Sequence, residues 1–145
     1  MKLQIKIDEP LIDQFAKQLN AEVVADILRL KSRLGVGTIK AHSFPDTLEC
    51  YHFEFNLEQQ VELTSANSVE SDYYLLNINL SEKEIEKTVN GEFFRFQKYL
   101  PTGILFYPPG TKVASSSPPK SSFEIVLVKF HRDLLNTYLG REVIF

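Results

Sequence analysis

Hydrophobic and polar residues alternate along much of the chain, and this pattern predicts a mostly β fold. The longest unbroken run is Leu48–Leu57, in which Tyr51, Phe53 and Phe55 share one face and polar residues occupy the other. Because successive side chains of a strand point to opposite sides, this run predicts a strand with one buried face. Runs of the same kind predict further strands over 2–7, 38–43, 73–80, 103–107 and 123–130.

Turn signals separate the predicted strands. The strongest is Asn90-Gly91, because both central positions of a type I′ turn have positive φ angles that Asn and Gly tolerate. It predicts a hairpin that joins 86–89 to 92–97. Pro45-Asp46 predicts another turn, and the serine-rich segment 115–122 predicts a polar loop between two strands.

Helical spacing occurs near both ends of the chain. Pro10 opens a predicted helix that continues to about Leu19, and residues 131–139 predict a second helix closed by Gly140. The apolar stretch 23–34 has an ambiguous period. Many short strands flanked by helices at both ends predict a β-barrel or jelly roll.

A chain of 145 residues fits a single domain. We expect residues 1–34 to form an N-terminal strand and helix extension, residues 35–130 the barrel, and residues 131–139 a C-terminal helix. The content of 43% hydrophobic residues is enough for a conventional core.

Charge and cysteine content narrow the range of partners. The net charge is −3 and basic residues are scattered among acidic ones, so direct contact with nucleic acid is not expected. Cys50 is the only cysteine, which excludes an intramolecular disulfide and indicates a reducing compartment. The sequence has no signal-like start and no apolar run near the roughly 20 residues that span a bilayer. The expected location is therefore the cytoplasm, without a membrane partner.

Residues with catalytic or metal-binding chemistry are sparse. His52 and Glu54 lie on one face of a predicted strand, so both could reach one metal ion, although an ordinary polar strand face has the same pattern. Cys50 has no cationic neighbour in sequence that would activate it, and there is neither a nucleophile-elbow pattern nor a glycine-rich phosphate loop. We therefore expect a binding protein with no catalytic residues and no cofactor.

Aromatic residues are abundant, with eleven Phe and six Tyr, and they gather on the predicted strands. An aromatic-lined interior is typical of a small-molecule pocket, and ordinary core packing gives the same pattern. The candidate ligand-binding residues are Phe53, Phe55, Tyr74, Phe94, Phe106 and Tyr107.

The segment Gly103–Thr111 resembles the second conserved stretch of cupins, in which Gly, an apolar strand and a Pro-x-Gly turn follow one another. Pro and Gly supply the fixed and the permissive backbone angles that a sharp reversal needs. Val113 occupies the position where metal cupins have a histidine ligand, and the His-x-His stretch of metal cupins has no match here. The resemblance implies a cupin barrel without its metal.

Within the cupins, the layout of residues 35–139 resembles the N-terminal sensor domain of AraC-type transcription regulators. The similar segments are Gly35–Lys40 before the 48–57 strand, the 73–80 strand, Leu100–Gly103 leading into the Pro-x-Gly turn, and the terminal strand and helix of 123–139. The resemblance implies a ligand-sensing or dimerisation domain without its DNA-binding helix-turn-helix part. Its partners would be a small-molecule effector, such as a carbohydrate or another small metabolite, and a second copy in a homodimer.

Two alternatives stay open at this point. One is a small metal-dependent cupin enzyme, an isomerase or dioxygenase, that uses His52, Glu54 and also His42. The other is a stand-alone sugar- or lipid-binding barrel.

Overall fold

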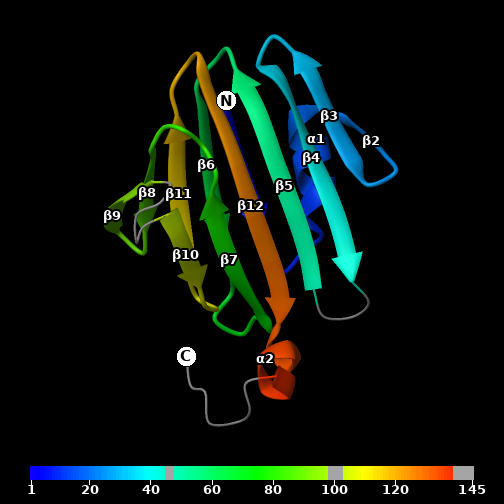
Figure 1. Ribbon diagram of the computed structural model, residues 1–145, viewed down its shortest axis with the longest axis vertical. Helices are drawn as coiled ribbons and strands as arrows, with labels where there is room; N and C mark the ends of the chain where they lie inside the picture. The colour runs from blue at the N-terminus through cyan, green and yellow to red at the C-terminus, as the bar shows by residue number, and fades with distance from the viewer. Residues whose placement is uncertain (45–47, 98–102, 139–145) are drawn as a thin grey trace.

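Two β-sheets face each other in a computed structural model that describes residues 1–44, 48–97 and 103–138. Figure 1 shows the strands of both sheets running along the long axis of the molecule, with α2 at one end. Within the described residues, no strand of one sheet is hydrogen-bonded to a strand of the other, so the sheets form a jelly-roll sandwich. No described helix has the length and apolar character of a membrane span.

The smaller sheet, sheet A, has five strands, and β1 pairs with β6 in parallel. In spatial order its strands are β1 (Lys2–Lys6), β6 (Val61–Ala66), β11 (Lys112–Ser117), β8 (Ile85–Val89) and β9 (Glu92–Phe96).

The larger sheet, sheet B, has seven strands with antiparallel pairing throughout. In spatial order these are β10 (Ile104–Tyr107), β7 (Tyr73–Asn79), β12 (Ser121–His131), β5 (Leu48–Leu57), β4 (Gly35–Phe44), β3 (Ile27–Ser32) and β2 (Glu22–Val24). The strands predicted over 38–43, 48–57, 73–80, 103–107 and 123–130 are all confirmed.

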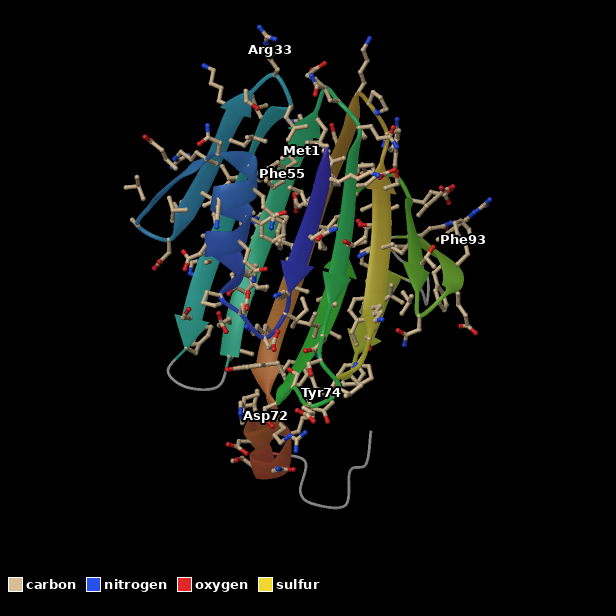
Figure 2. All side chains as sticks on the ribbon, turned by 180° about the vertical axis from the view of Figure 1, so that it is seen from behind. Met1, Arg33, Phe55, Asp72, Tyr74 and Phe93 are labelled. Carbon is tan, nitrogen blue, oxygen red and sulfur yellow. The ribbon has the colours of Figure 1, made fainter. Side chains whose placement is uncertain are left out.

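Helix α1 (Leu11–Leu19) covers one side of the sandwich, beside β1 (Figure 2). Pro10 precedes it and Asn20 ends it in the left-handed conformation. Leu11 and Phe15 are buried, whereas the Gln14 and Gln18 side chains bond the main chain of β1: Gln18 Nε2 donates to the Gln4 carbonyl at 2.7 Å. These side-chain amides satisfy main-chain N–H and C=O groups of an edge strand that would otherwise face solvent.

Helix α2 (Arg132–Tyr138) follows β12 directly, as the sequence predicts for its described part. His131 caps it, because its Nδ1 accepts a hydrogen bond from the Asp133 N–H at 3.1 Å. The predicted end at Leu139 and Gly140 lies outside the described residues, and so does the predicted turn at Pro45-Asp46.

The predicted hairpin at Asn90-Gly91 is confirmed. Its φ angles are 47° and 84°, and it joins β8 to β9. The ambiguous stretch 23–34 is also strand, since a second turn with positive φ at Ala25 and Asp26 joins β2 to β3.

The prediction of a polar loop over 115–122 is wrong. Ser115, Ser116 and Ser117 belong to β11, and Ser121 and Ser122 begin β12. Serine has no strong preference for strands, but β11 has a hydrogen-bonded partner on each side, β6 and β8. Pairing along both edges outweighs the local composition, and only 118–120 remain as a turn.

Candidate functional site: a cavity between the two sheets

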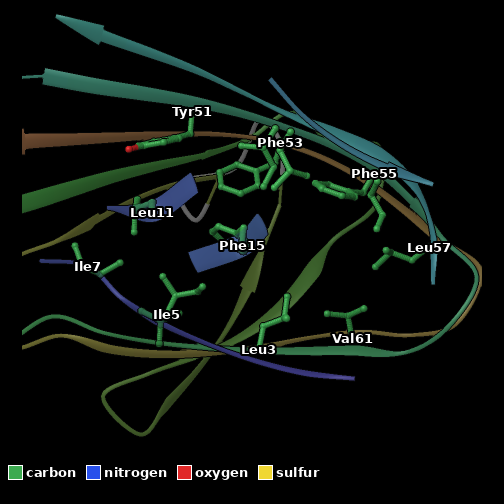
Figure 3. Close-up of a cluster of buried hydrophobic side chains, with 14 of the residues drawn as sticks. Leu3, Ile5, Ile7, Leu11, Phe15, Tyr51, Phe53, Phe55, Leu57 and Val61 are labelled. Atoms are coloured by element: carbon green, nitrogen blue, oxygen red, sulfur yellow. The ribbon is translucent and has the colours of Figure 1, made fainter. Parts of the chain in front are cut away.

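A cavity of about 130 Å³ lies between the inner faces of the sheets. Sheet A contributes Leu63 and Val113 to its wall, sheet B contributes Phe53 and Leu127, and α1 contributes Phe15. Figure 3 shows side chains from β1, β5 and α1 directed toward one another around this interior. An apolar cavity of roughly 150 Å³ holds one benzene molecule, so this one is large enough for a single ring or a short alkyl chain.

Three of the six candidate ligand-binding residues line the cavity: Phe53, Phe55 and Tyr107. The Phe53 ring packs edge-on against Phe15 with centroids 5.4 Å apart, and Phe55 stacks on Phe123 at 5.5 Å. These contacts fix both rings of β5 in the wall. Contact of the three residues with a ligand stays a prediction.

The other three candidates lie outside the cavity. Tyr74 and Phe106 are on the outer face of sheet B, where their rings stack at 5.7 Å and both stack on Phe130. Phe94 is the cross-strand partner of Lys87 and shares its face of sheet A, but it does not reach the cavity wall. The structure therefore separates the six aromatic residues into two groups.

Polar groups in this apolar wall concentrate around Lys87, which the sequence analysis missed. Lys87 lies on the inner face of β8 and is only 6% exposed. Its ammonium nitrogen is 4.7 Å from the centre of the Phe96 ring and 5.9 Å from that of Tyr107. Across the strand pair, Ser115 lies next to it on β11 and also lines the cavity.

The Lys87 ammonium has no ion pair and no hydrogen bond among the described residues. Burial alone lowers its pKa to about 8. Contacts with two ring faces are worth about 0.5–2 kcal/mol each, which is less than the several kcal/mol needed to remove an ammonium from water. The described groups around Lys87 therefore compensate its charge only in part.

A second buried lysine has the counter-charge that Lys87 lacks among the described residues. Lys129 on β12 is 3% exposed, and its ammonium lies 3.7 Å from the Glu49 carboxylate and 4.4 Å from the centre of the Tyr73 ring. It also bonds the Glu9 carbonyl at 3.4 Å. Burial lowers the pKa of Lys129, and the Glu49 carboxylate offsets part of that effect. Among the residues that the structure describes, Lys87 has no such counter-charge.

Within the described structure, two further polar atoms of the cavity have no hydrogen-bond partner: Asn77 Oδ1 on β7 and the Tyr107 hydroxyl on β10. Both residues are more than nine-tenths buried. Burial raises the pKa of the Tyr107 phenol, and the Asn77 amide close by offsets part of the rise. Buried polar atoms without partners are uncommon in native proteins. Asn67 Oδ1 and Ser121 Oγ are two more in the described structure, but neither residue lines the cavity, so only Asn77 and Tyr107 offer such atoms to a ligand there.

One sequence signal does point to Lys87. In the strand that ends at the Asn90-Gly91 turn, Ile85, Lys87 and Val89 occupy alternate positions and so share one face. Two apolar neighbours on that face place the lysine on the buried side. Asn77 and Ser115 give no comparable signal, because a polar residue in a strand usually lies on the solvent-facing side and nothing in the sequence marks these two as exceptions.

The candidate metal ligands lie on the other side of sheet B, away from the cavity. His52 and Glu54 of β5 are joined there by Glu124 of β12, and the ligand atoms of the three lie within 4.8 Å of one another. His52 Nε2 is 3.5 Å from Glu124 Oε1, an ion pair when the imidazole is protonated. His42, on the same outer face, is not part of this group.

The cavity itself does not suit a metal ion. None of the described residues that line it is His, Cys, Asp or Glu. Val113 occupies the position of the cupin histidine ligand; it points inward and is almost completely buried. A metal would require nitrogen, sulfur or carboxylate ligands that this wall does not offer.

Comparison with known proteins supports the fold. The cupin domain of Cnp3 from Schizosaccharomyces pombe has a TM-score of 0.52 and 17% identity, over 72% of this chain and 71% of that one. A predicted oxalate decarboxylase from Thermotoga maritima has a TM-score of 0.53 and 11% identity, over 76% of this chain and 99% of that one. A cupin-2 domain from Rhodospirillum rubrum has a TM-score of 0.50 and 12% identity, over 72% of this chain and 68% of that one.

No family model matches the sequence, and no curated protein does either. The similarity is therefore one of structure. The chain has the cupin fold, and the predicted cupin-like jelly roll with flanking helices is confirmed.

Proposed function

We propose that this cupin-fold chain binds a small molecule in the cavity between its two sheets. The observation that carries the proposal is the combination of an apolar cavity with a few unsatisfied polar groups at Lys87, Asn77 and Tyr107. A mostly apolar wall with a small number of converging polar groups is the usual design of a ligand pocket. Lys87 supplies a charge that its described neighbours compensate only in part, and Asn77 and Tyr107 supply polar atoms that a ligand can bond.

A sensor role of the AraC type is the wider function that we propose for this pocket. Phe123, Ile125 and Leu127 of β12 line the cavity, and the same strand runs directly into α2. Asp72 holds that junction, since its carboxylate lies 3.2 Å from Arg132 Nε and 3.8 Å from His131 Nε2 (Figure 2). A ligand that favours one position of β12 would thereby shift the position of α2.

The metal-dependent enzyme is less well supported. Its ligands His52 and Glu54 lie on the outer face of sheet B, so a metal there would be separated from a substrate in the cavity by the sheet itself. Metal catalysis requires contact between the metal and the reacting atoms.

The direct test is binding of toluene, a neutral molecule of one ring, measured by ligand-observed NMR. We expect the wild-type protein to bind toluene and the Leu127→Trp variant to lose at least tenfold in affinity, because the larger side chain fills the cavity. Val128→Trp is the matched control, since Val128 follows Leu127 on β12 and points to the outer face.

If Leu127→Trp does not fold, Ser115→Leu fills the cavity from sheet A instead. The proposal is wrong if neither toluene nor an aromatic acid such as benzoate binds the folded wild type, or if a folded cavity-filling variant binds as tightly as the wild type.

The sensor role has a test of its own. Hydrogen exchange of the α2 amides should change on ligand binding, and an unchanged exchange rate would contradict the sensor role.

A further inference from the structure

We infer that the ligand of this cavity is a small monocarboxylate, with its apolar body in the wall and its carboxylate on Lys87. The inference rests on the proposed function and adds the chemical class of the ligand. It follows from three features of the cavity: the sign of its one charge, the character of its free polar atoms and its volume.

The charge of Lys87 decides the sign of the ligand. Its ammonium is buried against the rings of Phe96 and Tyr107 and has no carboxylate partner among the described residues. An anion in the cavity would supply the counter-charge that Glu49 supplies to Lys129. A cation would be repelled, and a dianion such as a phosphate monoester would bring more charge than one lysine balances.

The free polar atoms agree with a carboxylate. A carboxylate has two acceptor oxygens. The Tyr107 hydroxyl, whose oxygen lies close to the Asn77 amide, can donate its proton to one while Lys87 donates to the other. Asn77 Oδ1 accepts from a donor beside that head group, such as the Lys87 ammonium or a hydroxyl on the ligand. These groups lie on β8, β10 and β7, so both sheets take part in the contact.

The volume and the wall limit the rest of the ligand. A cavity of about 130 Å³ holds one ring or a short chain and excludes a long fatty acid. The remaining wall is built mainly of Leu, Ile, Val and Phe side chains. Its three serine hydroxyls, on Ser65, Ser115 and Ser117, are too few to bond the many hydroxyls of a sugar. An aromatic or short branched carboxylic acid therefore fits better than the carbohydrate that the family resemblance suggested.

The test compares benzoate with benzamide, a neutral molecule of nearly the same shape, by isothermal titration calorimetry at pH 7. We expect the wild type to bind benzoate at least tenfold more tightly than benzamide. In the Lys87→Met variant, benzoate should lose at least tenfold in affinity while benzamide and toluene keep theirs. The matched control is Lys112→Met, which removes an exposed cation from β11 and should leave all three affinities unchanged.

The outcomes separate this inference from the proposed function. If toluene and benzamide bind and benzoate binds no better, the carboxylate assignment is wrong and the binding function stands. If benzoate binds Lys87→Met as tightly as the wild type, Lys87 is not its counter-charge and the assignment is likewise wrong. If no probe binds the wild type, both proposals fall. The benzoate–benzamide comparison on the wild type needs no variant to fold.

Discussion

At the scale of single residues, what surrounds a buried charge matters more than how deeply it is buried. Lys87 and Lys129 are buried to almost the same extent, yet of the two only Lys129 has a carboxylate beside it in the described part of the chain. A buried charge with a counter-charge recovers part of its desolvation free energy, whereas one without a counter-charge destabilises the folded state until a ligand supplies it. This difference makes Lys87 the most informative single residue of the cavity.

The pH dependence of stability tests the burial of Lys87. Its pKa falls from the ordinary 10.5 to about 8 in the folded state, so below pH 8 both the folded and the unfolded states are protonated and folding bears the full cost of the buried charge. Between pH 8 and 10.5 the unfolded state holds more protons, so the free energy of unfolding rises with pH, by roughly 3 kcal/mol in total. Lys87→Met lacks this rise.

We therefore expect Lys87→Met to be more stable than the wild type at pH 7, and the difference to shrink as the pH approaches 10.5. Urea denaturation at a series of pH values measures the free energy of unfolding of the wild type and of Lys87→Met. Lys112→Met, an exposed substitution on β11, controls for the general effect of removing a positive charge. A stability difference for Lys87→Met that does not change with pH would contradict the burial of the charge.

At the scale of elements, two glycines serve the fold in different ways. Gly37 of β4 lies directly across from Phe55 of β5, and a Cβ at position 37 would approach the Phe55 Cδ1 atom to 2.3 Å. The absence of a side chain there leaves room for a ring of the cavity wall. Gly91 has a φ of +84° in the β8–β9 turn, with no heavy atom within 4 Å of a Cβ built there. Its role is conformational.

These roles predict different consequences of substitution by alanine. Gly91→Ala should cost about 1–2 kcal/mol of stability through backbone strain and leave toluene binding unchanged. Gly37→Ala should cost about 1–3 kcal/mol or more and also weaken toluene binding, because Phe55 must move. Chemical denaturation and NMR titration measure the two effects. Unchanged toluene affinity in Gly37→Ala would contradict the packing described for Phe55.

At the scale of the whole molecule, the first 34 residues belong to both layers of the sandwich. β1 pairs with β6 in sheet A, β3 pairs with β4 in sheet B, and α1 lies between them with Phe15 in the cavity wall. Ile5 of β1 is buried and lines the same cavity. This segment thus closes one side of the space between the sheets.

Loss of a single side chain in this segment should therefore destabilise the whole domain. Ile5→Ala should lower the free energy of unfolding by about 2–5 kcal/mol, since it removes buried methyl groups from the core. Val24→Ala on β2 is the control, because Val24 is 67% exposed and its loss should change stability by less than about 0.5 kcal/mol. Equal effects of the two substitutions in thermal or urea unfolding would show that residues 1–34 are not part of the core.

Local sequence patterns were enough to predict the strands with clean alternation and the turns with special backbone angles. The 48–57 run predicted β5 and its buried face correctly, because Tyr51, Phe53 and Phe55 alternate with polar residues and only one face is apolar. Asn90-Gly91 predicted its hairpin because the two residues tolerate the positive φ angles found there. Both patterns are local, so the strand and the hairpin could be predicted without knowledge of any tertiary contact.

Which face of β7 points inward depends on how its neighbours pack, and no local pattern predicts it. Its outer face carries Tyr74, Leu76 and Ile78, whereas its inner face carries Tyr73, Leu75 and two asparagines, so the outer face is the more hydrophobic. Pairing with β12 and β10 fixes the register, and it turns Tyr74 and Phe106 outward and Asn77 into the cavity. The same holds for Ser115 on β11, which pairing with β6 and β8 brings into the wall beside Lys87. Alternation states which side chains share a face, but the stacking of the two sheets decides which face encloses the cavity.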